Sequence, residues 1–338
     1  MSMQEIRKNA KEKLKGFCRV CSVCDGKVCA GEVPGMGGLG TGTSFKANLE
    51  ALAKVKLKMK TIHGAKDPST KTSLFGQEFA TPIQGAPMTG TTYNMGGAVP
   101  EEDFISYVVE GSLKAGSIGW TGDGADPTMY DSGLKAVKVA AGKAIPIIKP
   151  RAQEEIIKRI KAAEEAGALA VGVDIDGAGL VTMALKGQPV GPKTFEELKE
   201  IVSSTKLPFI LKGIMTVEEA KLAVEIGAAA IVVSNHGGRV LDHTHGAAQV
   251  LSTIADAVKG KVIIFADGGV RTGSDVLKLL ALGADGVLLG RPLITGAFGG
   301  AVEGVEEVIK TLTKELYQAM ILTGCNSIAD INSSILDQ

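Results

Sequence analysis

The sequence has few aromatic residues, no excess of either charge and no long apolar run. Aromatic side chains make up 4% of its 338 residues, whereas glycine occurs 44 times. Lysine plus arginine and aspartate plus glutamate number 37 each, which argues against nucleic acid or an anionic membrane as a partner. No apolar run approaches the ~20 residues of a membrane span, and the charged N-terminus lacks the apolar core of a signal peptide. These absences favour a soluble, cytoplasmic protein.

Cysteine is also scarce, but four of the five cysteines lie close together. The stretch CRVCSVCDGKVC places them with the spacing C-x2-C-x2-C-x4-C, as Cys18, Cys21, Cys24 and Cys29, while Cys325 stands alone. In a long cytosolic chain such a cluster indicates a metal site rather than disulfides. Thiolates at this spacing can bind an iron–sulfur cluster or a single zinc ion. We favour a [4Fe–4S] cluster; structural zinc and unrelated reduced thiols stay open.

A recurring pattern runs along the chain: an amphipathic stretch, a glycine, a small residue and an apolar run. The glycines are at positions 116, 167, 227 and 283. A helix that ends in a C-cap glycine and continues directly into a buried strand produces this pattern. The repeats span 114–120, 165–174, 225–235 and 281–291, and further apolar runs occur at 82–87, 146–149, 208–212 and 262–266, which together give eight expected strands.

The continuous apolar runs predict strands buried on both faces of a parallel sheet. Expected helices alternate with them, at 101–115, 128–142, 153–166, 194–204, 216–226, 246–258, 273–282 and 303–323. Eight strand–helix units predict a (β/α)8 TIM barrel over 82–338, with a doubly wound sheet as the alternative. Residues 1–81 form a helical, cysteine-rich extension without a linker, so we expect it to pack on the barrel.

Polar residues follow the expected strands at their carboxyl ends, where barrels of this kind place their chemistry. Two of these segments suit an anion, DGGVRTG at 267–273 and GRP at 290–292. Their glycines allow close backbone approach, the helix starting near Ser274 adds a positive dipole end, and Arg271 and Arg291 supply charge. We therefore predict a phosphate site after the last two strands.

The stretch SNHGGRVLD at 234–242 suggests a reactive centre. His236 directly follows a buried strand, and Arg239 lies three residues further on, so a base stands beside a group that can bind a carboxylate. Asp174 could stabilise the imidazolium form of His236, and Lys212 supplies a fixed positive charge. The other histidines, His63, His243 and His245, are expected to be solvated.

Two stretches resemble a known family, ILKGIMTVEEAKLAVEIGAAAIVVSNHGGRVLD and FADGGVRTGSDVLKLLALGADGVLLGRP. They are similar to the FMN-dependent 2-hydroxy-acid dehydrogenases and oxidases, such as glycolate and lactate oxidases, and a fainter likeness starts near residue 44. The resemblance implies His236 as catalytic base, assisted by Asp174, with flavin N5 accepting the hydride and Arg239 binding the substrate carboxylate. It implies an FMN site formed by Ala86, Pro87, Met88, Lys149, Lys212, Ser234, Asp267, Gly268, Gly269, Arg271, Gly290 and Arg291.

The chain departs from this family in the part of the site that binds substrate. The expected tyrosine before the first barrel strand is missing from VPGMGGLGTG, and a Gln-x-Tyr is replaced by IIKPR, which puts Lys149 or Arg151 there. A second substrate arginine is absent from DIDGAGLVTMALKG, which offers only Lys186. The flavin part of the site is therefore expected to be intact and the substrate part remodelled.

The function that this resemblance implies is oxidation of a small 2-hydroxy acid, such as lactate or glycolate, to the 2-oxo acid. A [4Fe–4S] cluster would let electrons leave without oxygen, which would make the protein a dehydrogenase; the electron acceptor is unidentified. The alternatives are a non-redox FMN barrel, such as a type 2 isopentenyl diphosphate isomerase, and a flavin electron-transfer or regulatory protein. Related barrels are often tetramers, so we expect a homo-oligomer.

Overall fold

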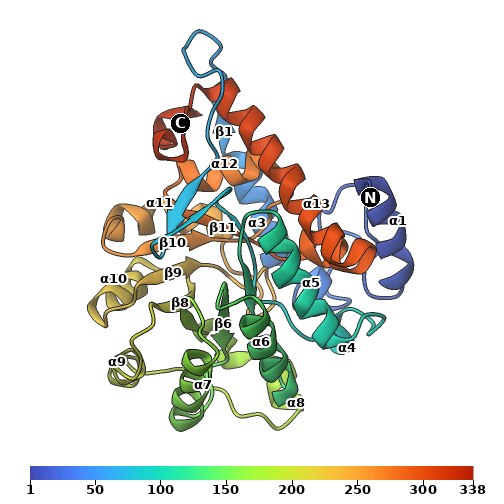
Figure 1. Ribbon diagram of the computed structural model, residues 1–338, viewed down its shortest axis with the longest axis vertical. Coiled ribbons are helices and arrows are strands. Elements are labelled where there is room, and N and C mark those ends of the chain that lie inside the picture. Colours follow the sequence, from blue (N-terminus) through green and yellow to red (C-terminus); the bar gives the residue numbers. More distant parts are fainter. Residues whose placement is uncertain (338) are drawn as a thin grey trace.

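The computed structural model describes residues 1–337 and contains a closed barrel of eight parallel strands (Figure 1). Each strand pairs with its neighbours in chain order, and the last pairs with the first, with Val287 opposite Ile83. This closure confirms the predicted barrel and excludes an open doubly wound sheet. The barrel strands are β4 (Ile83–Gly85), β5 (Gly119–Thr121), β6 (Ala144–Ile148), β7 (Val171–Asp174), β8 (Phe209–Ile214), β9 (Ala230–Val233), β10 (Ile263–Ala266) and β11 (Gly286–Leu289).

Helices surround the barrel close to the expected ranges. They are α5 (Glu101–Lys114), α6 (Pro127–Val139), α7 (Gln153–Glu165), α9 (Phe195–Ser203), α10 (Val217–Glu225), α11 (Ala247–Val258), α12 (Gly273–Ala281) and α13 (Arg291–Thr323). The last helix begins 12 residues earlier than the expected 303, because Pro292 lies in its first turn directly after β11. A kink at Gly300 and Ala301 separates the two halves of α13.

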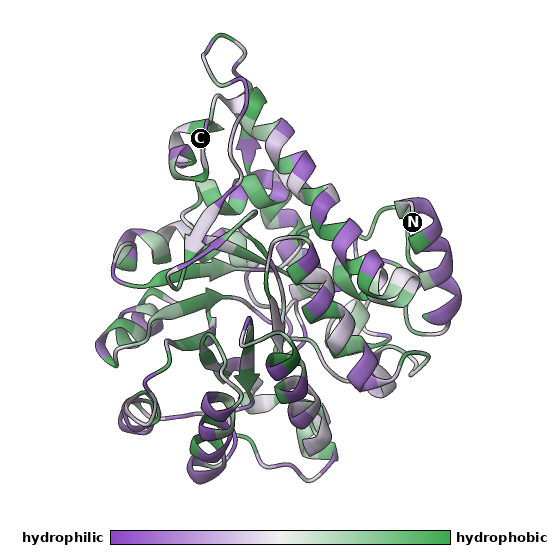
Figure 2. Ribbon diagram, viewed as in Figure 1, coloured by the Kyte–Doolittle hydropathy of each residue, from purple (hydrophilic) through white to green (hydrophobic). Residues whose placement is uncertain are grey.

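The hydrophobic residues lie in two layers. Side chains that point into the barrel form one cluster, in which Trp120 packs edge-on against Phe265 with ring centroids 5.0 Å apart. Side chains on the outer face of the strands pack against the helices. Figure 2 shows hydrophobic colour along the strands and hydrophilic colour on much of the helical surface. The filled interior forces any ligand to bind at an end of the barrel.

The first 81 residues pack against the barrel at several places. The hairpin of β2 (Thr72–Leu74) and β3 (Gln77–Phe79) adds Leu74 and Phe79 to the interior cluster.

The smaller elements of the whole chain are α1 (Met3–Lys13), α2 (Pro34–Gly37), α3 (Thr43–Lys54), β1 (Lys56–Leu57), α4 (Thr91–Asn94), η1 (Ile175–Gly179), α8 (Val181–Leu185), η2 (Ile328–Asp330), η3 (Ser333–Ile335) and β12 (Leu336–Asp337). The division into extension and barrel stays a prediction, and this packing accords with it.

Helix α1 lies beside the first half of α13 (Figure 1). Ile6 is completely buried there, and the side-chain amide of Asn9 donates a 3.1 Å hydrogen bond to the carbonyl of Gly299. A Cβ at Gly299 would lie 2.0 Å from the Ile6 carbonyl oxygen, so glycine permits this close approach.

Within residues 1–337, every helix is too short or too polar to cross a membrane.

Candidate active site

Two adjoining cavities open at the carboxyl ends of the barrel strands, and both are lined by Pro87, Asn94, His236 and Arg239. The first also contains most of the residues predicted from sequence to bind a cofactor: Ala86, Met88, Lys212, Asp267, Gly268, Gly269, Arg271, Gly290 and Arg291. The second is smaller and is lined by side chains that include Tyr93, Met129, Lys149, Leu180 and Thr182. His236 and Arg239 therefore lie where the two cavities meet. A catalytic base and an anion-binding residue would occupy this position if one cavity held a cofactor and the other a substrate.

The imidazole of His236 is held by acidic residues that follow β7. Its Nδ1 lies 3.1 Å from Oδ2 of Asp176 and 3.8 Å from Oδ2 of Asp174. Lys212 Nζ also lies 3.2 Å from Nδ1, but the two carboxylates at this nitrogen favour the tautomer that carries a proton on it, which leaves Nε2 free to accept a proton. Sequence reasoning identified Asp174 as the partner, but the structure adds Asp176 at shorter range.

Asp176 reaches His236 because of a bulge in the neighbouring strand. The pairing between β8 and β9 shifts register between Lys212 and Ile214, and Gly213 in the bulge has φ +99°. A Cβ on Gly213 would lie 2.5 Å from Cβ of Asp176, so only glycine leaves room for this side chain. The glycine after Lys212 in an apolar strand is a signal that sequence reasoning could have used, since an isolated strand glycine often marks a bulge.

The electrostatic environment favours a neutral His236. Burial lowers the pKa of its imidazole well below the usual 6.5, and the cations of Lys212 and Lys149 lower it further. Burial alone would also lower the pKa of Lys212, but the carboxylates of Asp176 and Asp174 outweigh it and raise that pKa. Neutral pH therefore leaves a charged lysine beside an uncharged base.

The group Asp174, Asp176 and His236 brings three potential metal-ligand atoms within 4.8 Å of one another. Two ammonium groups already occupy its surroundings, because Lys149 Nζ lies 2.7 Å from Asp174 and Lys212 Nζ lies 3.6 Å from Asp176. These cations balance the two carboxylates. The arrangement therefore fits a proton-transfer centre rather than a cation site.

The predicted phosphate end forms a compact cationic surface. The guanidinium of Arg291 lies 4.2 Å from the ring centroid of Phe45, and that of Arg271 lies 5.8 Å from the same ring. Burial lowers the pKa of Arg291, and the charges of Arg271 and Arg239 add to that effect. Half-buried guanidinium groups that repel one another would be stabilised by an anion.

A helix N-terminus also faces this surface, but it belongs to α13. The expected contribution from the helix near Ser274 is reduced, because Thr272 and Asp275 form a capping box that satisfies the first N–H groups of α12. Helix α13 follows Gly290, which offers no side-chain cap, and Gly290, Arg291 and Pro292 line the cavity. The uncapped end of α13 is therefore the dipole available to a bound anion.

Several buried polar atoms in the first cavity have no hydrogen-bond partner among the described residues: Asp267 Oδ1, Arg239 Nε and Arg271 Nε. Buried donors and acceptors are seldom left unsatisfied, so they indicate a polar ligand. Ser234, which the sequence also predicted as a cofactor contact, is completely buried and lines neither cavity; its hydroxyl accepts a 3.0 Å hydrogen bond from the backbone N–H of His236. Unpaired donors, an unpaired acceptor and a glycine-rich wall together fit a nucleotide-like cofactor with a phosphate tail.

The second cavity is lined by one of the two residues that the sequence offered in place of the family's Gln-x-Tyr. Lys149 lines this cavity and Arg151 does not, since Arg151 donates two hydrogen bonds to the buried Asp123, at 2.7 and 2.9 Å. Sequence reasoning missed Tyr93, which lies in α4 after the first barrel strand rather than before it. Lys186 Nζ lies 5.2 Å from the centre of the Tyr93 ring, so its charge also reaches this region.

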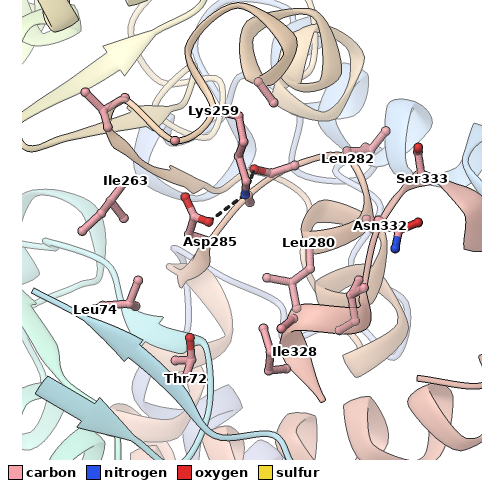
Figure 3. A pocket seen from close by; sticks show the side chains of 18 of the residues that line it. Thr72, Leu74, Lys259, Ile263, Leu280, Leu282, Asp285, Ile328, Asn332 and Ser333 are labelled. Atoms are coloured by element: carbon pink, nitrogen blue, oxygen red, sulfur yellow. Dashed lines mark hydrogen bonds and ion pairs between the residues drawn. The ribbon is translucent and has the colours of Figure 1, made fainter. Parts of the chain in front are cut away.

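A further and larger cavity lies at the opposite end of the barrel, at the amino ends of β9, β10 and β11 (Figure 3). Its most prominent charged contact is the pair of Lys259 and Asp285, 2.7 Å apart. This pair also binds the local backbone, because Asp285 accepts from Ile264 N–H and Lys259 donates to the Gly283 carbonyl. These contacts account for both side chains as structural, so we assign no chemistry to this end.

The chain is similar to known proteins over almost its whole length. A family model described as FMN-dependent dehydrogenase matches residues 35–187 and 180–338. The 2-hydroxyacid oxidase of Dictyostelium discoideum is 33% identical over 327 residues, which cover 86% of this chain and 81% of that protein. The L-lactate oxidase of Nostoc sp. is 48% identical over 143 residues, which cover 42% of this chain and 39% of that protein.

A solved structure agrees with these relatives. The crystal structure of mandelate oxidase superposes with a TM-score of 0.81 at 27% identity, covering 99% of this chain and 97% of that chain. The barrel, the His236–Arg239 site and the matched family model point the same way. The chain belongs to the FMN-dependent dehydrogenase family.

Proposed function

We propose that this protein is an FMN-dependent oxidoreductase that oxidises a small 2-hydroxy acid to the 2-oxo acid, with His236 as the catalytic base. The observation that carries the proposal is the position of His236 and Arg239 between a glycine- and arginine-lined cavity and a smaller polar one. The names of the relatives, 2-hydroxyacid oxidases, L-lactate oxidase and mandelate oxidase, support this substrate class.

The residues of the first cavity fit FMN. Gly268, Gly269, Arg271, Gly290 and Arg291 would hold the phosphate, since they combine exposed backbone N–H groups with two guanidinium charges. The remaining contacts would come from the backbone of Ala86, Pro87 and Met88 and from the side chains of Lys212, Ser234 and Asp267. When bound, FMN supplies a two-electron acceptor for the hydride equivalent that leaves the substrate carbon.

The side chains around His236 divide the remaining work. The Nε atom of Arg239 is buried and has no hydrogen-bond partner among residues 1–337, so this side chain is available to bind the substrate carboxylate. His236 accepts the substrate proton at Nε2, and the carboxylates of Asp174 and Asp176 stabilise the resulting imidazolium. Lys212 keeps its positive charge beside the base and would offset negative charge that develops on the cofactor.

Lys149 and Tyr93 are proposed to set substrate preference, because they line the second cavity together with Met129 and Leu180. Lys149 was also predicted from sequence as a cofactor contact, and that role stays a prediction. The electron acceptor stays unidentified. The expected homo-oligomer, a tetramer by resemblance, stays a prediction that light scattering of the purified protein would test.

Anaerobic mixing with a panel of 2-hydroxy acids tests the proposal. We expect one acid, among lactate, glycolate and mandelate, to bleach the flavin absorbance of the wild-type protein. His236→Ala should bind FMN but bleach about 10²–10⁴-fold more slowly, the usual contribution of a general base. His243→Ala is the matched control, since the His243 side chain is 71% exposed and lines neither cavity.

Two outcomes would replace the proposal with an alternative. Isomerisation of isopentenyl diphosphate without net redox change would indicate a non-redox FMN barrel. Flavin that no hydroxy acid reduces, but that exchanges electrons with a chemical reductant, would indicate an electron-transfer or regulatory flavoprotein.

A further inference from the structure

The four clustered cysteines lie beside the cofactor cavity, although they are more than 200 residues away in sequence from the strands that form its phosphate end. A guanidinium nitrogen of Arg271, Nη2, donates to Sγ of Cys24 at 3.3 Å. Arg271 lines the cavity and its Nε has no partner among the described residues. One side chain thus connects the cysteine segment to the predicted phosphate site.

The cysteine segment is fitted tightly against the barrel mouth. Gly26 has φ +71°, and a Cβ there would lie 2.0 Å from the ring of Phe45, which also contacts Arg271 and Arg291. Arg291 Nε donates a 2.7 Å hydrogen bond to the carbonyl of Met36, which follows the last cysteine of the cluster. These contacts hold the cysteine segment in one position relative to the cavity.

The backbone of the segment itself is held in an unusual conformation. Val20, between the first two cysteines, has φ +47°, a region that β-branched residues rarely adopt. The guanidinium of Arg7, from α1, donates to the carbonyls of Val20 and Cys21 and keeps this turn in place. Cys18, Cys21, Cys24 and Cys29 are all half-buried free thiols.

The spacing of the sulfur atoms bears on which metal group they could bind. Four thiolates around one zinc ion, each at about 2.3 Å, would lie less than ~4 Å from one another. Among residues 1–337, no three cysteine sulfurs lie within 4.8 Å of one another. A [4Fe–4S] cluster requires wider separation, because each thiolate binds a different iron atom.

We propose that Cys18, Cys21, Cys24 and Cys29 bind a [4Fe–4S] cluster at the barrel mouth, linked electrostatically to the phosphate end of the FMN site through Arg271. A cluster with four thiolate ligands carries net negative charge, and the guanidinium of Arg271 donates to one of its ligands. Hydrogen bonds and positive charge near the sulfurs stabilise the reduced form and raise the reduction potential.

If the proposed function holds, the cluster also provides an exit for electrons. Converting a 2-hydroxy acid to the 2-oxo acid releases two electrons and two protons. A [4Fe–4S] cluster transfers one electron at a time, so two equivalents of a one-electron redox protein would be reduced for each acid oxidised. The two protons would go to solvent, one of them through His236.

Metal analysis of the full-length protein, purified anaerobically, tests the cluster. We expect about four iron and four acid-labile sulfide per chain, and an electron paramagnetic resonance signal after reduction with dithionite. Cys24→Ser should lose the cluster or greatly reduce its content, whereas Cys325→Ser, which removes the buried cysteine outside the cluster, should keep it. One zinc per chain, or no iron after reconstitution with iron and sulfide, would overturn the proposal.

A redox titration of the wild-type cluster and of Arg271→Gln tests the electrostatic link. Loss of the guanidinium should shift the midpoint potential of the cluster to a more negative value, and an unchanged potential would refute the link. The readout needs no turnover, and wild-type protein decides the main question even if a cysteine variant does not fold.

Reduction by substrate tests the electron exit. The hydroxy acid that bleaches the flavin should also produce the signal of the reduced cluster, and bleaching without cluster reduction would overturn this route. Failure of every acid to bleach the flavin would instead count against the proposed function. Reduction with dithionite would still test whether the cluster is present.

Discussion

His236 has a left-handed backbone conformation, with φ +58°, which is uncommon for a residue other than glycine. The residue ends a buried strand, and two glycines with positive φ, Gly237 and Gly238, continue the turn. Strained conformations of this kind persist where the surrounding structure over-determines them, often at functional sites. Here the strain directs the imidazole toward Asp176 instead of along the strand.

At the residue scale, we expect Asp176→Asn to lower kcat by about 10-fold or more, because the amide cannot stabilise the imidazolium as a carboxylate does. KM should change little, since Asp176 lines neither cavity. Steady-state kinetics at saturating substrate separate the two quantities. Asp131→Asn, at an exposed position of α6, is the control; a variant with raised KM and normal kcat would show that Asp176 serves binding instead.

Lys149 gives a second prediction, on pH dependence. His236 acts as a base only when neutral, so kcat/KM falls as pH drops through its pKa, which burial first and then Lys212 and Lys149 depress. Lys149→Met removes one of these cations and should raise that pKa. The acid limb of the pH profile should therefore move to higher pH.

The control for this measurement is Lys158→Met, because the Lys158 side chain is 79% exposed on the outside of the barrel. Its pH profile should match the wild type. An acid limb of Lys149→Met that stays in place or moves to lower pH would contradict the assigned role of the lysine charge.

At the scale of elements, the bulge in β8 decides whether the carboxylates can reach His236. The register shifts between Lys212 and Ile214, and the glycine in the bulge leaves the space that Asp176 occupies, since a Cβ at position 213 would lie 2.5 Å from Cβ of Asp176. A single glycine, Gly213, thus determines whether the charged side chains of Lys212, Asp174 and Asp176 can lie together beside His236. Such irregularities commonly occur beside active sites, where they redirect a side chain.

We expect Gly213→Ala to disturb the site more than its backbone strain alone explains. An alanine at φ +99° costs about 1–2 kcal/mol in conformation, and its Cβ would also displace Asp176. Gly260→Ala is a matched control, since Gly260 has φ +80° and nothing within 4 Å of an added Cβ. Both variants should lose stability in thermal unfolding, but only Gly213→Ala should also lose most of its kcat; equal kinetics would disprove the steric argument.

At the scale of the whole molecule, the extension and the barrel are expected to fold as one unit. Ile6 in α1 is completely buried against α13, and Arg7 from the same helix holds the cysteine segment at the barrel mouth. Loss of α1 packing should therefore affect the barrel and the site together.

Ile6→Ala should lower the free energy of unfolding by about 2–5 kcal/mol, the usual cost of truncating a buried isoleucine. Denaturation followed by circular dichroism and by flavin fluorescence should give a single shifted transition with both probes. Lys8→Ala, at an exposed position of the same helix, should leave the transition in place. Two separate transitions would show instead that residues 1–81 unfold independently.

Much of this protein could be predicted from the sequence alone, because the signals are local. Glycines at helix ends and continuous apolar strands predict the barrel. The polar residues that follow these strands predict which end of the barrel contains the active site; they include His236, Arg239, Arg271 and Arg291. Each of these inferences depends only on period, spacing and residue type.

Tertiary structure decided the contacts between distant segments. It places Asp176 as well as Asp174 beside His236, and Tyr93 in the lining of the second cavity. It also pairs Arg151 with Asp123 and places Cys24 in contact with Arg271. These outcomes depend on a strand bulge, on glycines that permit close approach and on packing between residues up to 247 positions apart. Local sequence patterns do not encode such distances, because each depends on how two separately folded segments meet in space.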